Sequence, residues 1–92
     1  MRFEFDKKKS EKLRRNPKRK TGFEEAAEIW EHPYYEDQRS DDPEQFRVIG
    51  WIRGRLYSVI YELREDEEGE YYHLVTLWKS TGQEKKLYER NL

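Results

Sequence analysis

Hydrophobic and polar residues alternate in three runs along the second half of the chain. Residues typical of turns lie between these runs. The runs span residues 46–52, 55–63 and 71–79. A period of two is typical of β-strands, and short connections favour antiparallel neighbours. The pattern therefore predicts a three-stranded antiparallel meander, with Arg53-Gly54 as a hairpin turn and residues 64–69 as an acidic turn.

The segment before this meander has the period of an α-helix instead. One helical stripe carries four apolar residues, Phe23, Ala26, Ala27 and Trp30. Such a stripe is typical of a helix that lies on a sheet. Thr21 and Glu24 have the spacing of a capping box, in which both side chains bond free backbone amides. We therefore expect a helix from about residue 22 to Glu31.

Two further helices are expected near the ends of the chain. Asp6 can cap a helix over residues 7–15, which the Asn16-Pro17 pair would end. Thr81-Gly82-Gln83-Glu84 forms a second capping box and opens a helix over residues 82–90.

Two other segments complete the expected fold. Residues 2–5 alternate as a short edge strand, and the polar residues 34–43 resemble a loop with room for a short strand. We therefore expect a single α+β domain over residues 1–92 in the order β-α-α-β-β-β-α. It would hold a small antiparallel sheet, made of the meander and the N-terminal edge strand, with two N-terminal helices and a C-terminal helix.

The turns also predict which strand residues share a face. The hairpin turn places Val48 opposite Val59, and pairing of Arg64 with Glu70 would place Val75 opposite Val59. One face then carries Phe46, Val48, Tyr57, Val59, Tyr61, His73, Val75 and Leu77. The other carries Ile49, Trp51, Leu56, Ile60, Tyr72, Leu74 and Trp78. We expect the second helix to cover one face, and the C-terminal helix with another chain to cover the other.

Composition indicates a thin core and two kinds of surface. Only 34% of the residues are hydrophobic and 42% are charged, whereas the 15% aromatic content favours a folded chain. Residues 1–20 carry ten Lys or Arg against three acids, and residues 21–70 carry five against fifteen. A basic arm on an acidic body suggests two different partner surfaces.

Several classes of chemistry find no support in the sequence. The chain has no cysteine, which excludes disulfides and thiolate catalysis. No cluster has the spacing of metal ligands, and no motif for a cofactor or an activated nucleophile is present, so we expect neither metal nor cofactor. No apolar run is long enough for a signal peptide or a membrane span, so we expect a cytoplasmic protein without membrane contact.

A series of short marks runs along nearly the whole chain. The marks are Phe3-Glu4-Phe5-Asp6, Lys9, Lys18, Phe23-Glu24-Glu25-Ala26, Phe46, Ile49-Gly50, Arg55, Tyr61, Arg64, Thr76, Lys79-Ser80-Thr81, Glu84 and Leu87-Tyr88. Through the order and spacing of these marks, the chain resembles the BrnT-like toxin family of type II toxin–antitoxin systems. The resemblance implies a RelE-like fold and a metal-independent endoribonuclease that inhibits translation. It also implies a cognate antitoxin, a ribbon-helix-helix DNA-binding protein, that neutralises the toxin in a heterotetramer.

The chain departs from the family pattern at polar positions. Arg19 replaces a His, Leu13 an Asn, and Gln45 and Trp78 each an Arg, while His73 stands at a basic position. These changes fall where the family would handle RNA.

Five residues are our candidates for the chemistry of RNA cleavage. Such cleavage without a metal needs a general base, a general acid and a positively charged side chain beside the phosphate. His73 has a side chain that titrates near neutral pH, and Arg64 and Lys79 at strand ends can clamp a phosphate. Lys18 and Arg19 would add charge and proton transfer. The alternative is a packed His73 and four solvated cations.

Two functions from different classes follow. The first is a toxin that binds and cleaves RNA. The second is a non-catalytic descendant that binds a protein partner, its nuclease site eroded through Gln45, His73 and Trp78. A folded domain with no nucleic-acid role is a third reading, because RNA-binding domains are usually more basic than a net charge of −1.

Overall fold

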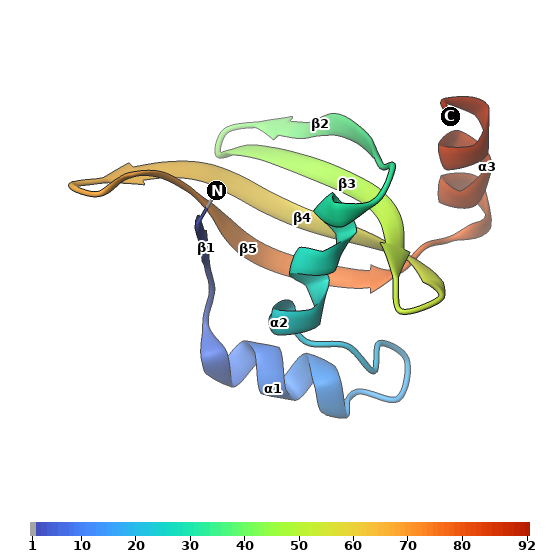
Figure 1. Cartoon of the computed structure of the whole chain (residues 1–92), viewed down its shortest axis with the longest axis horizontal. Helices are drawn as coiled ribbons and strands as arrows, with labels where there is room; N and C mark the ends of the chain where they lie inside the picture. Colours follow the sequence, from blue (N-terminus) through green and yellow to red (C-terminus); the bar gives the residue numbers. More distant parts are fainter. Residues whose placement is uncertain (1) are drawn as a thin grey trace.

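A five-stranded sheet forms the centre of the molecule, with helices on both sides (Figure 1). The computed structural model describes residues 2–92. In chain order its elements are β1 (Arg2–Glu4), α1 (Lys7–Arg15), α2 (Phe23–Ala26), the 3₁₀ segment η1 (Ala27–Glu31), β2 (Tyr35–Asp41), β3 (Glu44–Ile52), β4 (Arg55–Asp66), β5 (Gly69–Lys79) and α3 (Gly82–Arg90). The predicted α+β class is confirmed.

The strands lie in the order β1-β5-β4-β3-β2. β1 runs parallel to β5, and the other neighbours are antiparallel, so the sheet is mixed. The expected three-stranded meander is incomplete: the segment predicted as a loop with room for a short strand contains the seven-residue β2, a fourth antiparallel strand. β2 lies at the edge of the sheet and exposes Glu36, Gln38 and Arg39. A strand exposed in this way has little apolar alternation by which a sequence pattern could reveal it.

The hairpin between β3 and β4 has the predicted register. Val48 lies opposite Val59, and Phe46 lies opposite Tyr61. Arg53 and Gly54 form the turn, with φ angles of 48° and 85°. Two successive positive φ angles give a turn whose twist matches that of the flanking strands.

A bulge in β5 changes the faces predicted for that strand. Ile60 pairs with Thr76 and Tyr61 pairs with Leu74, so Val75 is the extra residue. The predicted pairing of Val59 with Val75 is therefore wrong, since Val59 lies opposite Leu77.

The pairing of β4 with β5 differs from the prediction in two further ways. Tyr72 and Leu74 belong to the face of Val59, whereas His73 belongs to the opposite face. The ladder also continues to Asp66 and Gly69, so only residues 67 and 68 connect the two strands, and Arg64 pairs with Tyr71 rather than with Glu70.

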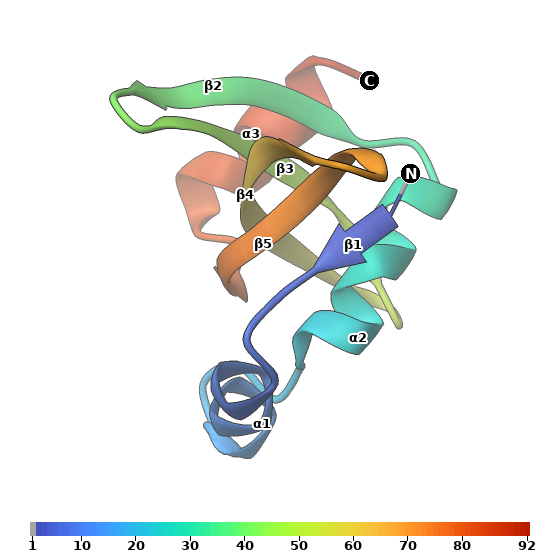
Figure 2. The same cartoon turned by 90° about the vertical axis from the view of Figure 1, so that its left-hand side faces the viewer.

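The larger core lies between the sheet and the N-terminal helices, which Figure 2 shows on the side opposite α3. Its fully buried side chains include Phe23 and Ile29 from the helical segments and Val48, Val59 and Leu77 from the strands. A row of partly buried aromatic residues extends this core toward β1: Phe3, Trp30, Phe46 and Tyr72. The predicted second helix is split, since one turn of α2 continues as the tighter η1.

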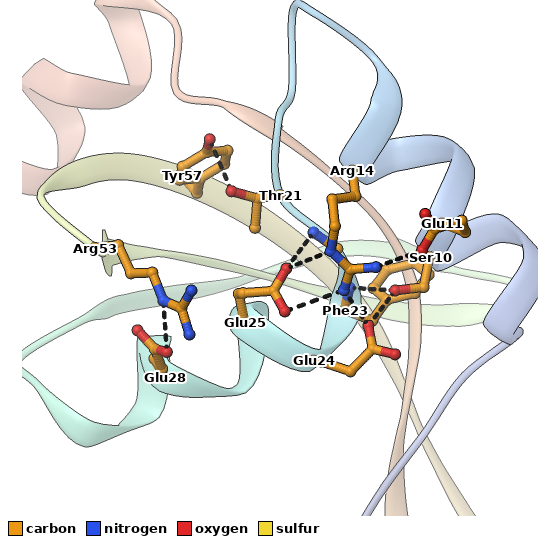
Figure 3. Close-up of polar contacts among 11 residues, drawn as sticks. Ser10, Glu11, Arg14, Thr21, Phe23, Glu24, Glu25, Glu28, Arg53 and Tyr57 are labelled. Carbon is orange, nitrogen blue, oxygen red and sulfur yellow. Dashed lines mark hydrogen bonds and ion pairs between the residues drawn. The ribbon is translucent and has the colours of Figure 1, made fainter.

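The start of α2 is held by α1 rather than by the predicted capping box (Figure 3). The Ser10 hydroxyl accepts from the Phe23 amide at 2.8 Å and donates to Glu24. Thr21 bonds the Tyr57 hydroxyl instead, at 3.0 Å. A Cβ on Gly22 would come within 2.7 Å of the Ser10 hydroxyl oxygen, so only glycine allows this close approach.

α3 covers one end of the second face of the sheet. Its predicted capping box is confirmed, because the Thr81 hydroxyl accepts from the Glu84 amide and the Glu84 carboxylate accepts from the Thr81 amide. Tyr88 packs there against Ile49 and Leu56. The rest of this face, which we call the open face, carries the partly exposed Gln45, Glu62, Tyr71, His73 and Thr76 and the exposed Arg64.

Candidate functional site

The open face brings together a carboxylate, a guanidinium and an imidazole. Glu62 and Arg64 alternate along β4, and His73 is the direct partner of Glu62 on β5. Residues directly opposite on antiparallel strands project from the same face. The three side chains, which we call the open-face cluster, therefore share one surface.

Two hydrogen-bonding neighbours fix the position of the Glu62 carboxylate. Arg64 donates to Oε1 of Glu62 from Nε at 3.0 Å and from Nη2 at 2.6 Å. Gln45 donates to Oε2 from its amide nitrogen at 2.8 Å. Both carboxylate oxygens are thus bonded, and the Arg64 side chain stays 46% exposed.

The local electrostatics set the charge state of each group. The Gln45 amide, followed by the Arg64 guanidinium, holds the pKa of Glu62 below its ordinary value, although burial opposes this. Burial lowers the pKa of His73 from 6.5, and the nearby charge of Arg64 lowers it further. At neutral pH the cluster therefore holds an anionic Glu62, a cationic Arg64 and a neutral His73.

This arrangement can perform part of an acid–base reaction on a phosphate ester. A neutral imidazole can accept a proton, and an exposed guanidinium can bind a phosphate oxygen. Tyr71 projects from the same face opposite Arg64 and has the Arg2 guanidinium 4.6 Å above its ring. Its hydroxyl is a proton donor within the same surface.

Carboxylates also neutralise a second guanidinium on this face. Arg47 pairs with Asp37, its Nε lying 3.0 Å from Oδ1, and it approaches Glu84 at 3.4 Å. Trp78 donates from its indole nitrogen to Glu84 at 2.9 Å, and the Arg39 guanidinium lies 5.3 Å from the centre of the Trp78 ring. The Trp78 indole on β5 is thus bonded to the first turn of α3.

The structure brings together two of the five predicted site residues, Arg64 and His73. Lys79 ends β5 six residues beyond His73, a separation of roughly 20 Å at about 3.3 Å per residue. Lys18 is exposed in the turn after α1. Arg19 has a structural contact, since its Nε donates to the Leu77 carbonyl oxygen at 2.8 Å. Of the five candidates, the structure thus places Arg64 and His73 on one surface and Lys79 about 20 Å along the strand from His73.

Glu62 is the member of the cluster that sequence reasoning did not identify. Its spacing of two residues from Arg64 was visible in the sequence, and it indicates a shared face. Its pairing with His73 was not visible, because it depends on the β5 bulge.

Comparison with known proteins adds no assignment: no protein-family model matches the chain, and no curated protein matches it. Among residues 2–92, no helix has the length and apolar character that a membrane span requires.

Proposed function

We propose that the protein is the toxin component of a type II toxin–antitoxin pair and acts as a metal-independent endoribonuclease that inhibits translation. The observation that carries the proposal is the shared surface of Glu62, Arg64 and His73 on the open face. The resemblance of the sequence to the BrnT-like toxins supports the same function. We include in the proposal the RelE-like fold that the resemblance implies.

In the proposed reaction an RNA strand lies across β4 and β5. Neutral His73 accepts the proton of a 2′-hydroxyl, whose oxygen attacks the adjacent phosphorus while Arg64 binds the phosphate oxygens. The bond to the 5′-oxygen breaks, and this oxygen takes the proton of Tyr71. The imidazolium and the phenolate then exchange a proton through solvent. The products are a 2′,3′-cyclic phosphate and a 5′-hydroxyl end, and Glu62 positions Arg64 throughout.

The test is incubation of the purified protein with RNA in buffer that contains a chelator. We expect cleavage with 2′,3′-cyclic phosphate ends, identified by mass spectrometry. His73→Gln should lower the rate about 10²–10⁴-fold, the range of a general base. His32→Gln is the matched control, because His32 is an exposed residue after η1, and this variant should cleave at the parent rate. Equal rates in both variants would refute the role of His73.

We propose a cognate antitoxin of the ribbon-helix-helix class as the partner, with a heterotetramer as the assembly. The open face is the surface offered to it, because only one end of that face is covered by α3. Expression of the protein alone should arrest growth and degrade RNA, and coexpression with the adjacent reading frame should restore growth. Unaffected growth in both cases would refute the toxin function.

A second candidate function is a catalytically eroded member of the same family that binds a protein partner. The observation in its favour is that carboxylates already pair Arg47 and Arg64 on the open face. This candidate predicts a stable complex with the antitoxin and no RNA cleavage by the parent protein. The cleavage assay therefore separates the two functions.

A further inference from the structure

A cavity of about 320 Å³ lies at the end of the sheet away from the acidic turn. The turn between β3 and β4, the last residues of β5 and the helix α3 surround it, and Figure 1 shows these three parts side by side. Its lining comprises Trp51, Gly54, Arg55, Leu56, Lys79, Ser80, Lys85, Tyr88 and Glu89. The volume is at the lower end of the ~300–1,000 Å³ typical of small-molecule sites, which suits one compact ligand.

Cations without carboxylate partners gather at the cavity. Arg55, Lys79 and Lys85 line it, and no ion pair within residues 2–92 uses any of them. Lys20 lies close enough to act on Lys79: burial lowers the pKa of Lys79, and the charges of Arg55 and Lys20 lower it further. Among the described residues of the lining, Glu89 is the one carboxylate, so the cavity carries excess positive charge that favours an anion.

One wall of the cavity is aromatic. Trp51 is 43% exposed, an unusual position for a large apolar ring, and Tyr88 lies edge-on to it with ring centroids 6.4 Å apart. Tyr88 is buried and bonds the Pro33 carbonyl oxygen, so the wall behind Trp51 is fixed. An exposed indole beside unpaired cations offers stacking for a planar ring next to binding of a phosphate.

We propose that this cavity binds a nucleoside phosphate, with the base stacked on Trp51 and the phosphate held by Arg55, Lys79 and Lys85. The ligand is either a free nucleotide or the phosphorylated end of a strand, since both present the same chemical unit. The site lies roughly 20 Å from His73 along β5, so it is separate from the open-face cluster and does not require cleavage activity.

The test is calorimetric titration of the full chain with AMP, adenosine and inorganic phosphate. AMP should bind at least about tenfold more tightly than adenosine or phosphate alone, because only AMP engages both the cations and the indole. Arg55→Ala and Lys79→Ala should each weaken AMP binding about tenfold. Trp51→Ala should weaken it about fivefold or more, and circular dichroism of each variant will verify the fold.

Two controls have matched chemistry outside the cavity. Arg53→Ala removes a neighbouring guanidinium that is paired with Glu28, and Lys86→Ala removes an exposed ammonium next to Lys85. Both should bind AMP as the parent does. Absence of AMP binding by the parent would overturn the proposal, as would equal losses in the control variants.

The source of the ligand is read from a second titration with short oligodeoxynucleotides that carry either a 5′-phosphate or a 5′-hydroxyl. These strands lack the 2′-hydroxyl, so the proposed cleavage cannot consume them. Tight binding of the phosphorylated strand indicates a strand end, and binding of AMP alone indicates a free nucleotide. If the protein binds AMP but cleaves no RNA, the proposed cavity site stands and the proposed ribonuclease function is refuted. If it cleaves RNA but does not bind AMP, only the cavity site is refuted.

Discussion

The open face and the cavity hold cations in opposite states. On the open face, Arg47 and Arg64 are bonded to carboxylates of the same chain. In the cavity, Arg55 and Lys79 line the same space as the Trp51 indole, and no ion pair among residues 2–92 uses either of them. A paired guanidinium is held in position before any ligand arrives, whereas unpaired cations gain most when an anion binds. The first state suits chemistry that depends on geometry, and the second suits binding.

In the comparison of paired with unpaired cations, the largest effect is expected from loss of the paired Arg64 on the open face. Arg64→Ala should lower the rate of RNA cleavage by about 10²–10³-fold, because the phosphate loses its positioned donor. Arg53→Ala is the control, since this arginine is exposed and pairs with Glu28 on the helical side of the sheet. Rates measured on one labelled RNA will compare the variants. A normal rate for Arg64→Ala would show that the open-face cluster does not act on phosphate.

A smaller effect, on the free energy of unfolding, is expected from loss of Glu84, which links the sheet to α3. Glu84 is 6% exposed and accepts from the Trp78 indole and the Thr81 amide. Glu84→Ala would leave these donors unpaired and should lower the free energy of unfolding by about 2 kcal/mol in urea titrations. Glu65→Ala, at an exposed position, should change it by less than about 0.5 kcal/mol. Equal losses would show that α3 is not held through Glu84.

Added salt should lower the affinity of the cavity for AMP by a modest factor. AMP binding in the cavity should weaken several-fold between ~0.05 and ~0.5 M NaCl, because the partner charges are exposed and unpaired. Calorimetry at each salt concentration will measure this change. Affinity that is independent of salt would contradict a phosphate contact.

The smallest effect concerns the proton on His73. Its pKa should lie below 6.5, because burial and the charge of Arg64 outweigh the opposing carboxylates of Glu62 and Glu4, with Lys9 adding to the decrease. The unfolded chain then protonates first as the pH falls, so this residue reduces stability below pH 6.5 and has no such effect above it. NMR titration of the imidazole will measure the pKa. A value above 6.5 would contradict the neutral base that the mechanism requires.

Much of the fold could be predicted from local patterns. Asp6 and Thr81 are the N-caps that the sequence indicated, and the Arg53-Gly54 turn sets the register of Val48 and Val59. These features depend on neighbours within a few residues or across one tight turn, where backbone geometry leaves few choices. β2 was not predicted as a full strand, because its polar side chains give no burial signal.

The candidate sites depended on longer-range arrangements. Arg64 and His73 could be chosen by residue type, but a single extra residue in β5 decided that His73 lies beside Glu62. The same bulge could not be predicted, because Val75 fits either register of an apolar strand. The cavity joins residues from β3, β4, β5 and α3, and no spacing in the sequence relates Trp51 to Lys79.

Local sequence patterns were enough to predict the α+β class, the ends of α1 and α3, and a set of candidate cations and aromatic residues. The pairing of these cations with carboxylates became clear only in the folded chain. Local patterns specify elements because capping and alternation act over a few residues. Pairing of charges depends on strand register and on how α3 meets the sheet, and only the folded chain fixes these distances.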